Sequence, residues 1–257
     1  MSNFNAPASI AETVISKVGV GKCKLTMGQT IVLGILAGAF IAFGAQLATR
    51  VMTGIEPFGL RVFMGGAVFS VGLMLVVIAG AELFTGNNLI MMSVLAKQTT
   101  VGKMIKYWVI VWIANFIGSI LIVLFMHYSG LVSGEIAKTA GSIAQAKANL
   151  DTLPLIFRAI MCNWLVCLAV WLALASQDII GKIFGIFFPI MAFVASGFEH
   201  SIANMYFIPM GMLVNPEITF AGAAHNIIWA TVGNIIGGAG FVATIYWYTY
   251  HKCTTNK

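Results

Sequence analysis

Two short polar strings lie inside long apolar stretches of this chain and repeat one another. In the first, Glu82 precedes Asn87 by five residues, and in the second, Glu199 precedes Asn204 by the same spacing. The two glutamates are 117 positions apart. Polar interruptions at corresponding positions of two apolar halves point to the substrate path of a membrane transporter or channel. The duplicated string therefore predicts such a path through the centre of the protein.

The residues that the two strings do not share are the candidates for chemistry. His200 is of the residue type whose charge changes near neutral pH, so it can offer a proton or a positive charge to an anion. A titratable residue inside a membrane is a functional candidate by default. Thr85 adds a hydroxyl from the other half. The shared glutamates are alternative proton carriers, but their positions favour a structural role. Together with the shared asparagines, they are expected to support the helix breaks, where carboxylates can accept stranded backbone N–H groups.

A second match extends the repeat. The run that begins at Asn115 recurs from Asn234, 119 positions later. We interpret the chain as two homologous halves of three spans each. Because three is odd, the halves must cross the membrane in opposite directions, related by a pseudo-two-fold axis in its plane.

Composition places the chain in a membrane. Hydrophobic residues make up 60% of the chain and charged residues 9%, against about 45–50% and about 25% in soluble proteins. The net charge of +6 comes from 14 basic residues spread thinly between apolar stretches. They form no basic patch, so a nucleic-acid partner is not expected, and membrane topology explains them better.

The fold class predicted is an all-α integral membrane protein with six spans. A bilayer of about 30 Å needs about 20 helical residues, and four plain stretches have that length: residues 27–48, 105–126, 153–175 and 221–248. The second and fifth spans, residues 58–96 and 183–214, are interrupted at residues 82–88 and 196–204, so each is predicted to be two half-helices. The half-helices that start near Asn87 and Ser201 would point their positive ends to the centre, which favours an anion.

Small residues predict close helix packing. Gly34 with Gly38, and Gly233 with Gly237, have the spacing that lets helix backbones approach one another.

The basic residues predict that both termini are cytoplasmic, because Lys and Arg concentrate on that side. The nine in the predicted inner segments are Lys17, Lys22, Lys24, Lys97, Lys103, Lys106, Lys182, Lys252 and Lys257, and the five outside are Arg50, Arg61, Lys138, Lys147 and Arg158. We expect one channel domain over residues 1–257. It comprises an amphipathic N-terminal segment (1–24, with Ile10, Val14 and Val18 four apart), a first repeat (25–128), an external loop (129–152), a second repeat (153–250) and a cytoplasmic tail (251–257).

No metal or cofactor is expected, and no enzymatic activity. Cys23, Cys162, Cys167 and Cys253 lack metal-ligand spacing and are interpreted as packing thiols. A haem-bearing redox subunit is disfavoured, because the four histidines (His127, His200, His225 and His251) show no axial-ligand pairing. A water or glycerol channel is the other alternative. It is disfavoured because no Asn-Pro-Ala motif occurs, and Asn215-Pro216 continues to Glu217.

Three runs closely resemble the bacterial formate/nitrite transporter family, which includes formate, nitrite and hydrosulfide channels. They are AELFTGN at residues 81–87, CNWLVCLA at residues 162–169 and ASGFEHSIANM at residues 195–205. The resemblance covers nearly all of the chain. It implies an aquaporin-like fold in the cell inner membrane, with five protomers around an axis and one pore in each protomer.

The resemblance also implies roles for individual residues. Thr85 and His200 resemble the polar pair at the middle of the pore. The residues that resemble its apolar constrictions are Leu73, Leu83 and Phe193, joined by Phe69 one helical turn from Leu73. Lys147 resembles a vestibule lysine that gathers anions, and Asn163 resembles a polar residue paired near it. Spacing alone favours solvated loop charges for Lys147 and Arg158, and the resemblance replaces that interpretation for Lys147.

The resulting hypothesis is a channel for small monovalent anions of weak acids. Lys147 and the half-helix dipoles draw in the anion, and His200 shares or donates a proton near Thr85. The constrictions then pass the near-neutral form, because a bare ion in a dry slit costs several kcal/mol. Formate, nitrite and hydrosulfide all fit, and the sequence leaves the choice among them open.

Overall fold

The computed structural model describes residues 4–252, which are helical apart from loops and one isolated β-bridge between Phe4 and Ser176. The expected all-α class is confirmed. Five helical segments are long and apolar enough to cross a membrane: α3 (Met27–Met52), Phe58–Gly80, α7 (Val101–Tyr128), α9 (Thr152–Ala175) and Phe220–Lys252. The second contains α4 (Phe58–Phe69), α5 (Val71–Met74) and η2 (Leu75–Gly80), and the fifth contains α12 (Phe220–Ile235), η4 (Ile236–Thr244), α13 (Ile245–Trp247) and η5 (Tyr248–Lys252). Cys253 and Lys257 lie outside the described residues.

Both predicted interruptions are breaks in helices. In the first half, the helix ends at Gly80, residues 81–85 are non-helical, and the chain re-enters a helix at η3 (Gly86–Leu89) and α6 (Ile90–Leu95). In the second half, α10 (Ile179–Ala195) is separated from α11 (Ser201–Val214). A glycine with positive φ lies at each break: Gly80, at +93°, is the last residue of the first helix, and Gly197, at +72°, lies between α10 and α11. Glycine adopts this conformation at little cost.

Glycines set how closely the helices pack. A Cβ added at Gly38 would lie 2.0 Å from the carbonyl O of Asn115, and one at Gly237 would lie 2.1 Å from that of Ile160. These glycines let α3 approach α7, and let η4, which continues α12, approach α9. The close packing expected from the glycine spacing is thus found within one chain.

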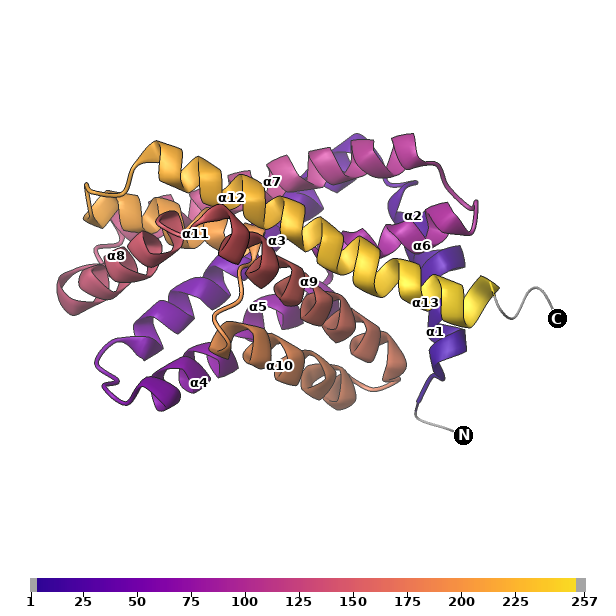
Figure 1. The fold of residues 1–257 in the computed structure, drawn as a ribbon, viewed down its shortest axis with the longest axis horizontal. Coiled ribbons are helices and arrows are strands. Elements are labelled where there is room, and N and C mark those ends of the chain that lie inside the picture. The colour runs from indigo at the N-terminus through magenta and orange to yellow at the C-terminus, as the bar shows by residue number, and fades with distance from the viewer. Residues whose placement is uncertain (1–3, 253–257) are drawn as a thin grey trace.

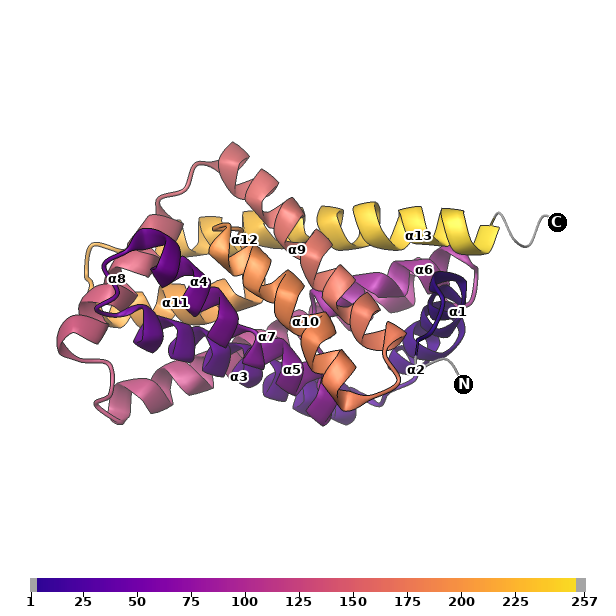
Figure 2. The same cartoon turned by 90° about the horizontal axis from the view of Figure 1, so that it is seen from below.

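The N-terminal segment packs on the protein rather than extending from it. It forms α1 (Pro7–Thr13), η1 (Val14–Gly19) and α2 (Val20–Lys22), and buries Ile10 and Val14 against a cluster that includes Met92 and Trp171. Ser93 of α6 donates a hydrogen bond to the Ile15 carbonyl at 2.7 Å. Figures 1 and 2 show α1 and α13 at the same end of the molecule, beside α6.

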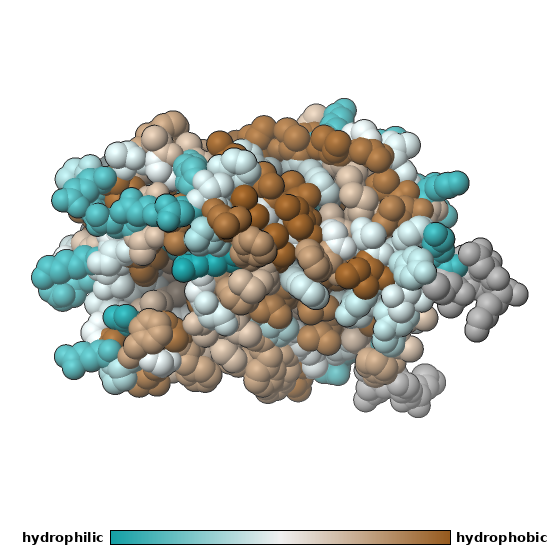
Figure 3. Space-filling model, viewed as in Figure 1, coloured by the Kyte–Doolittle hydropathy of each residue, from teal (hydrophilic) through white to brown (hydrophobic). Residues whose placement is uncertain are grey.

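The segment expected as an external loop contains a helix, α8 (Gly134–Ala148), which packs Ala144 and Ala148 against Ile208 of α11. Lys147 lies in its last turn. Its alanine-rich pattern is too polar to stand out beside the apolar spans. The face shown in Figure 3 is mostly apolar between two more hydrophilic ends, as in a protein surrounded by hydrocarbon.

Candidate functional site

A histidine and a threonine from the two breaks meet at the centre. Thr85 Oγ1 lies 2.9 Å from His200 Nε2, and both residues are almost fully buried. His200 is also the N-cap of α11, because its Nδ1 accepts the backbone N–H of Ala203 at 3.0 Å. An imidazole nitrogen that accepts carries no proton, so the proton of the neutral ring is on Nε2, which donates to Thr85 Oγ1. The Thr85 hydroxyl, which accepts this bond, keeps its own hydrogen to donate.

Apolar side chains close the space around this pair. A cavity of about 10 Å³ is lined by Ile41, Phe69, Leu73, Leu83, Val166, Ile190, Phe193 and His200. That volume is at the lower limit of what one water molecule needs, about 10–15 Å³. The structure thus brings together all four residues that resemble constrictions. It adds Ile41, Val166 and Ile190, which carry no sequence signal that separates them from other apolar residues in their spans.

Two larger cavities lie on either side. The Lys22 vestibule, of about 530 Å³, is lined by Lys22 and Glu82 and shares Leu73 and Leu83 with the small cavity. The Lys147 vestibule, of about 320 Å³, is lined by Lys147, Arg158 and Glu199 and shares Phe69, Phe193 and His200 with it. The three cavities therefore lie in series, and His200, which contacts Thr85, lines the narrow one.

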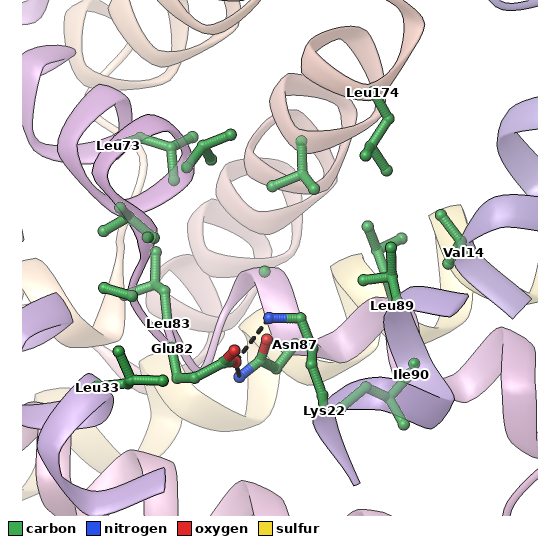
Figure 4. A pocket seen from close by; sticks show the side chains of 18 of the residues that line it. Val14, Lys22, Leu33, Leu73, Glu82, Leu83, Asn87, Leu89, Ile90 and Leu174 are labelled. Atoms are coloured by element: carbon green, nitrogen blue, oxygen red, sulfur yellow. Dashed lines mark hydrogen bonds and ion pairs between the residues drawn. The ribbon is translucent and has the colours of Figure 1, made fainter. Parts of the chain in front are cut away.

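Each vestibule contains a Lys–Glu–Asn group of the same design. In the Lys22 vestibule, Glu82 Oε2 lies 2.6 Å from Lys22 Nζ and accepts from Asn87 Nδ2 at 3.0 Å, as Figure 4 shows. The Lys147 vestibule repeats this arrangement: Glu199 Oε1 lies 2.9 Å from Lys147 Nζ, and Glu199 Oε2 accepts from Asn204 Nδ2 at 2.7 Å.

The glutamates differ from the sequence expectation in one respect. Among the described residues, the hydrogen bonds of the Glu82 and Glu199 carboxylates come from lysine and asparagine side chains and not from stranded backbone N–H groups. The lysines explain the difference, because a buried carboxylate without a charged partner is strongly destabilising. From the sequence alone, Lys22 is only one of the basic residues that indicate topology.

The two vestibules differ in charge. Lys22 and Glu82 balance, whereas Lys147 and Arg158 outnumber Glu199 among the charged groups that line the second vestibule. Within residues 4–252, no ion pair involves Arg158. Spacing alone predicts a solvated loop charge for Arg158. Arg158 lies beside the loop that carries Glu199, because the backbone N–H of Glu199 donates to the Arg158 carbonyl at 3.4 Å.

Asn163 lies deeper than the sequence suggested. It is fully buried, and its Nδ2 donates to the carbonyls of Asn234 at 2.7 Å and Thr85 at 3.2 Å. Lys147 has Glu199 as its partner instead, so the structure does not pair Asn163 with Lys147. Cys167 packs beside this group, with its thiol 3.5 Å from the Thr85 carbonyl.

Comparisons with known proteins agree with one another. The family model described as "Formate/nitrite transporter" matches residues 8–248. A probable formate transporter of Methanothermobacter thermautotrophicus is 46% identical over 272 residues, covering 98% of this chain and 99% of that protein. Formate channel FocA of Escherichia coli (strain K12) is 37% identical over 268 residues, covering 95% and 94%. A solved structure, "Pentameric formate channel with formate bound", superposes with a TM-score of 0.77 at 32% identity, covering 87% of this chain and 97% of that one.

Proposed function

The chain belongs to the formate/nitrite transporter family, and on that premise we propose that it is a channel for small monovalent anions of weak acids, formate and nitrite first among them. The similarity to a probable formate transporter and to formate channel FocA supports formate, and membership of a formate/nitrite transporter family supports nitrite. Hydrosulfide fits the same chemistry, being small, singly charged and the base of a weak acid. A neutral-solute channel is the alternative that a transport assay has to exclude.

We propose a six-span architecture of two inverted repeats, with α10 and α11 as a broken fifth span. Trp112 Nε1 donates to Thr231 Oγ1 at 3.0 Å, and these residues are 119 positions apart, the same offset as Asn115 and Asn234. Equivalent residues of two repeats lie side by side only near the axis that relates them. The contact therefore supports a pseudo-two-fold axis between α7 and α12.

The assembly and its orientation are also part of the proposal. The solved relative is a pentamer, which supports a homopentamer with one pore in each protomer. Both described ends of the chain lie at the Lys22 end of the molecule, where α1, α6 and α13 gather. The excess of Lys and Arg in the segments assigned to that end supports cytoplasmic termini in a bacterial inner membrane. The domain plan over residues 1–257 follows from this orientation.

The proposed mechanism begins with attraction of the anion. Lys147 and Arg158 give the Lys147 vestibule an excess of positive charge, which raises the local concentration of anions. The N-terminus of α11 adds its dipole. The N–H groups of Ser201 and Ala203 are already engaged, because Asn234 Oδ1 accepts from Ser201 and His200 Nδ1 accepts from Ala203.

At the narrow point, hydrogen bonds replace water. The Nε2–H of His200 is shared between Thr85 Oγ1 and the anion, and the Thr85 hydroxyl donates its own hydrogen to the anion between the apolar constrictions. Hydrogen bonds to charged groups contribute about 1.5–3 kcal/mol each, so two of them offset part of the cost of removing the anion from water. With the ring neutral and its proton on Nε2, His200 shares that proton with the anion through a hydrogen bond. Full transfer requires a ring that also carries a proton on Nδ1, which would break the bond from the Ala203 N–H.

The observation that carries the proposal is the Thr85–His200 contact of 2.9 Å inside an apolar constriction. The test is flux into liposomes that contain the purified protein, with formate, nitrite and hydrosulfide each measured against chloride, and with osmotic swelling in glycerol as a control. The proposal predicts flux of the weak-acid anions above that of chloride and no swelling. Swelling in glycerol without anion flux would overturn it in favour of a neutral-solute channel.

A further inference from the structure

Two buried asparagines hold the helix breaks in the same way. Asn115 Oδ1 accepts the N–H of Phe84 at 2.9 Å, and its Nδ2 donates to the carbonyls of Glu82 at 2.9 Å and Gly34 at 2.8 Å. The side chain thus bonds to both neighbours of Leu83 and to a second helix. Asn115 is fully buried in α7.

Asn234 repeats this pattern in the other half. Its Oδ1 accepts the N–H of Ser201 at 2.9 Å, and its Nδ2 donates to the carbonyls of Glu199 at 2.9 Å and Ala159 at 2.8 Å. It is also fully buried, and it bonds to both neighbours of His200. The two asparagines therefore clamp equivalent peptide segments, and the residue in each clamp is Leu83 in one half and His200 in the other.

We infer that Asn115 and Asn234 are positioning residues of the pore: Asn115 holds the constriction residue Leu83, and Asn234 holds His200 at hydrogen-bond distance from Thr85. The inference rests on the proposed function, because it gives these two clamped residues their roles in transport. It also assigns a purpose to the Asn115–Asn234 match in the sequence, which the pore chemistry itself leaves unexplained.

Asparagine suits this task for a chemical reason. A broken helix leaves backbone N–H and C=O groups without partners, and each costs about 1–3 kcal/mol when buried unsatisfied. One amide supplies an acceptor and two donors in a fixed geometry. An aspartate of the same shape retains the acceptor but has no donor while ionised, and its second oxygen would then face two carbonyl oxygens. A leucine supplies none of the three bonds.

A third asparagine joins the two halves. The Asn163 Nδ2 group that donates to the Thr85 carbonyl also donates to the Asn234 carbonyl. The distance between Thr85 and His200 is therefore set by a continuous buried network of amide side chains and not only by the packing of the apolar constrictions. A small displacement of Asn234 is expected to reach both members of the pair.

The test compares Asn234→Asp and Asn234→Leu with wild type in formate flux across a pH series. Gln98→Glu is the matched control, because it makes the same amide-to-carboxyl change at an exposed loop position. We expect Asn234→Leu to lower flux at least tenfold at every pH. Asn234→Asp should regain flux, relative to wild type, as the pH falls, because a protonated carboxyl group recovers one donor. Gln98→Glu should follow wild type throughout.

The outcomes separate this inference from the proposed function. Wild-type protein that carries no anion refutes the proposed function whatever the variants do. If wild type conducts and Asn234→Asp matches it at every pH, or falls by a constant factor independent of pH, the positioning role is refuted. If Asn234→Leu does not fold, Asn234→Asp purified at low pH carries the test alone.

The matched variant in the other half gives a second readout. Asn115→Asp should loosen Leu83 and raise the permeability of acetate relative to formate. Asn234→Asp should instead act mainly on the pH dependence of formate flux, with a smaller effect on the acetate-to-formate ratio. Identical effects of the two substitutions on both readouts would show a general loss of structure and refute the separate roles.

Discussion

The His200 imidazole accepts the backbone N–H of Ala203 through Nδ1, at 3.0 Å, while its Nε2 faces Thr85 at 2.9 Å. One side chain therefore caps a half-helix and presents a proton to the pore. The two tasks depend on each other, because the cap determines which nitrogen carries the proton. A cap of this kind contributes about 0.5–2 kcal/mol.

The two tasks of His200 separate in His200→Asn. Asparagine is among the best N-cap residues but has no group that reaches as far as Nε2. We expect the free energy of unfolding of His200→Asn to lie within about 1 kcal/mol of the wild-type value, and we expect this variant to lose most anion flux. Thermal unfolding and liposome flux of the same preparation check this. His200→Phe, which loses the cap as well, should be less stable, and equal stability of the two variants would contradict the capping role.

The Lys147–Glu199 pair is expected to stabilise the fold only as a pair. The side chains are 16% and 4% exposed, so Lys147→Met leaves a buried carboxylate without its cation, a loss of about 3–5 kcal/mol. Combining Lys147→Met with Glu199→Gln should restore a large part of that stability and should leave the affinity for the anion reduced. Denaturation in detergent and the concentration dependence of flux measure the two effects. A double variant as unstable as Lys147→Met would contradict this account.

Arg158 is expected to act through charge in the Lys147 vestibule. Arg158→Gln should lower flux about two- to threefold at low ionic strength, and the difference should shrink as salt is added, because the screening length falls to about 10 Å at 0.1 M. Arg50→Gln, in the last turn of α3 and not among the residues that line the vestibule, is the control. An effect of Arg158→Gln that does not change with salt would rule out this electrostatic role.

The dry constriction predicts a specific loss of selectivity. Val166→Ala removes two methyl groups from the lining of the small cavity and should admit water and larger weak acids such as acetate. The expected stability cost is about 1–3 kcal/mol, below that of a leucine-to-alanine change. Acetate flux and osmotic swelling measure the change. Unchanged acetate flux in a folded variant would place the selective step elsewhere.

Close helix packing predicts that one added methyl group is not tolerated between α3 and α7. Gly38→Ala would bring its Cβ to 2.0 Å from a backbone oxygen, so the helices must separate. We expect a loss of several kcal/mol, in line with severe overpacking. Gly102→Ala, in α7 with no atom within 4 Å of the new Cβ, should be neutral or slightly stabilising. Thermal unfolding of both variants decides the point.

Much of this architecture is visible in the sequence because membranes impose simple rules. The polar string around Glu82 and its copy around Glu199 predict the breaks, since polar groups in hydrocarbon are retained only where they are used. The match of Asn115 with Asn234 shows that these positions are equivalent, but it does not reveal that the side chains clamp the breaks. That role depends on helix crossings, which a linear pattern does not contain.

Other features depend on three-dimensional placement in the same way. Helix α8 has no apolar run that would predict it. Arg158 resembles a loop charge in the sequence, and only the fold brings the Glu199 segment beside it. Asn163 is polar in an apolar span, which predicts a special role, but the sequence does not state whether it faces the pore or supports it. In the structure, the Asn163 side chain donates a hydrogen bond to the backbone carbonyl of Thr85.

The central claim is that Thr85 and His200 act together as hydrogen-bond donors to the permeating anion. The most direct measurement is formate flux through Thr85→Val, Thr85→Ser and His200→Phe in liposomes, at equal protein content and across a pH series. The account predicts that Thr85→Ser conducts much as wild type does, that Thr85→Val and His200→Phe each lose most of the flux, and that combining them adds little. Wild-type flux and pH dependence in His200→Phe would contradict it.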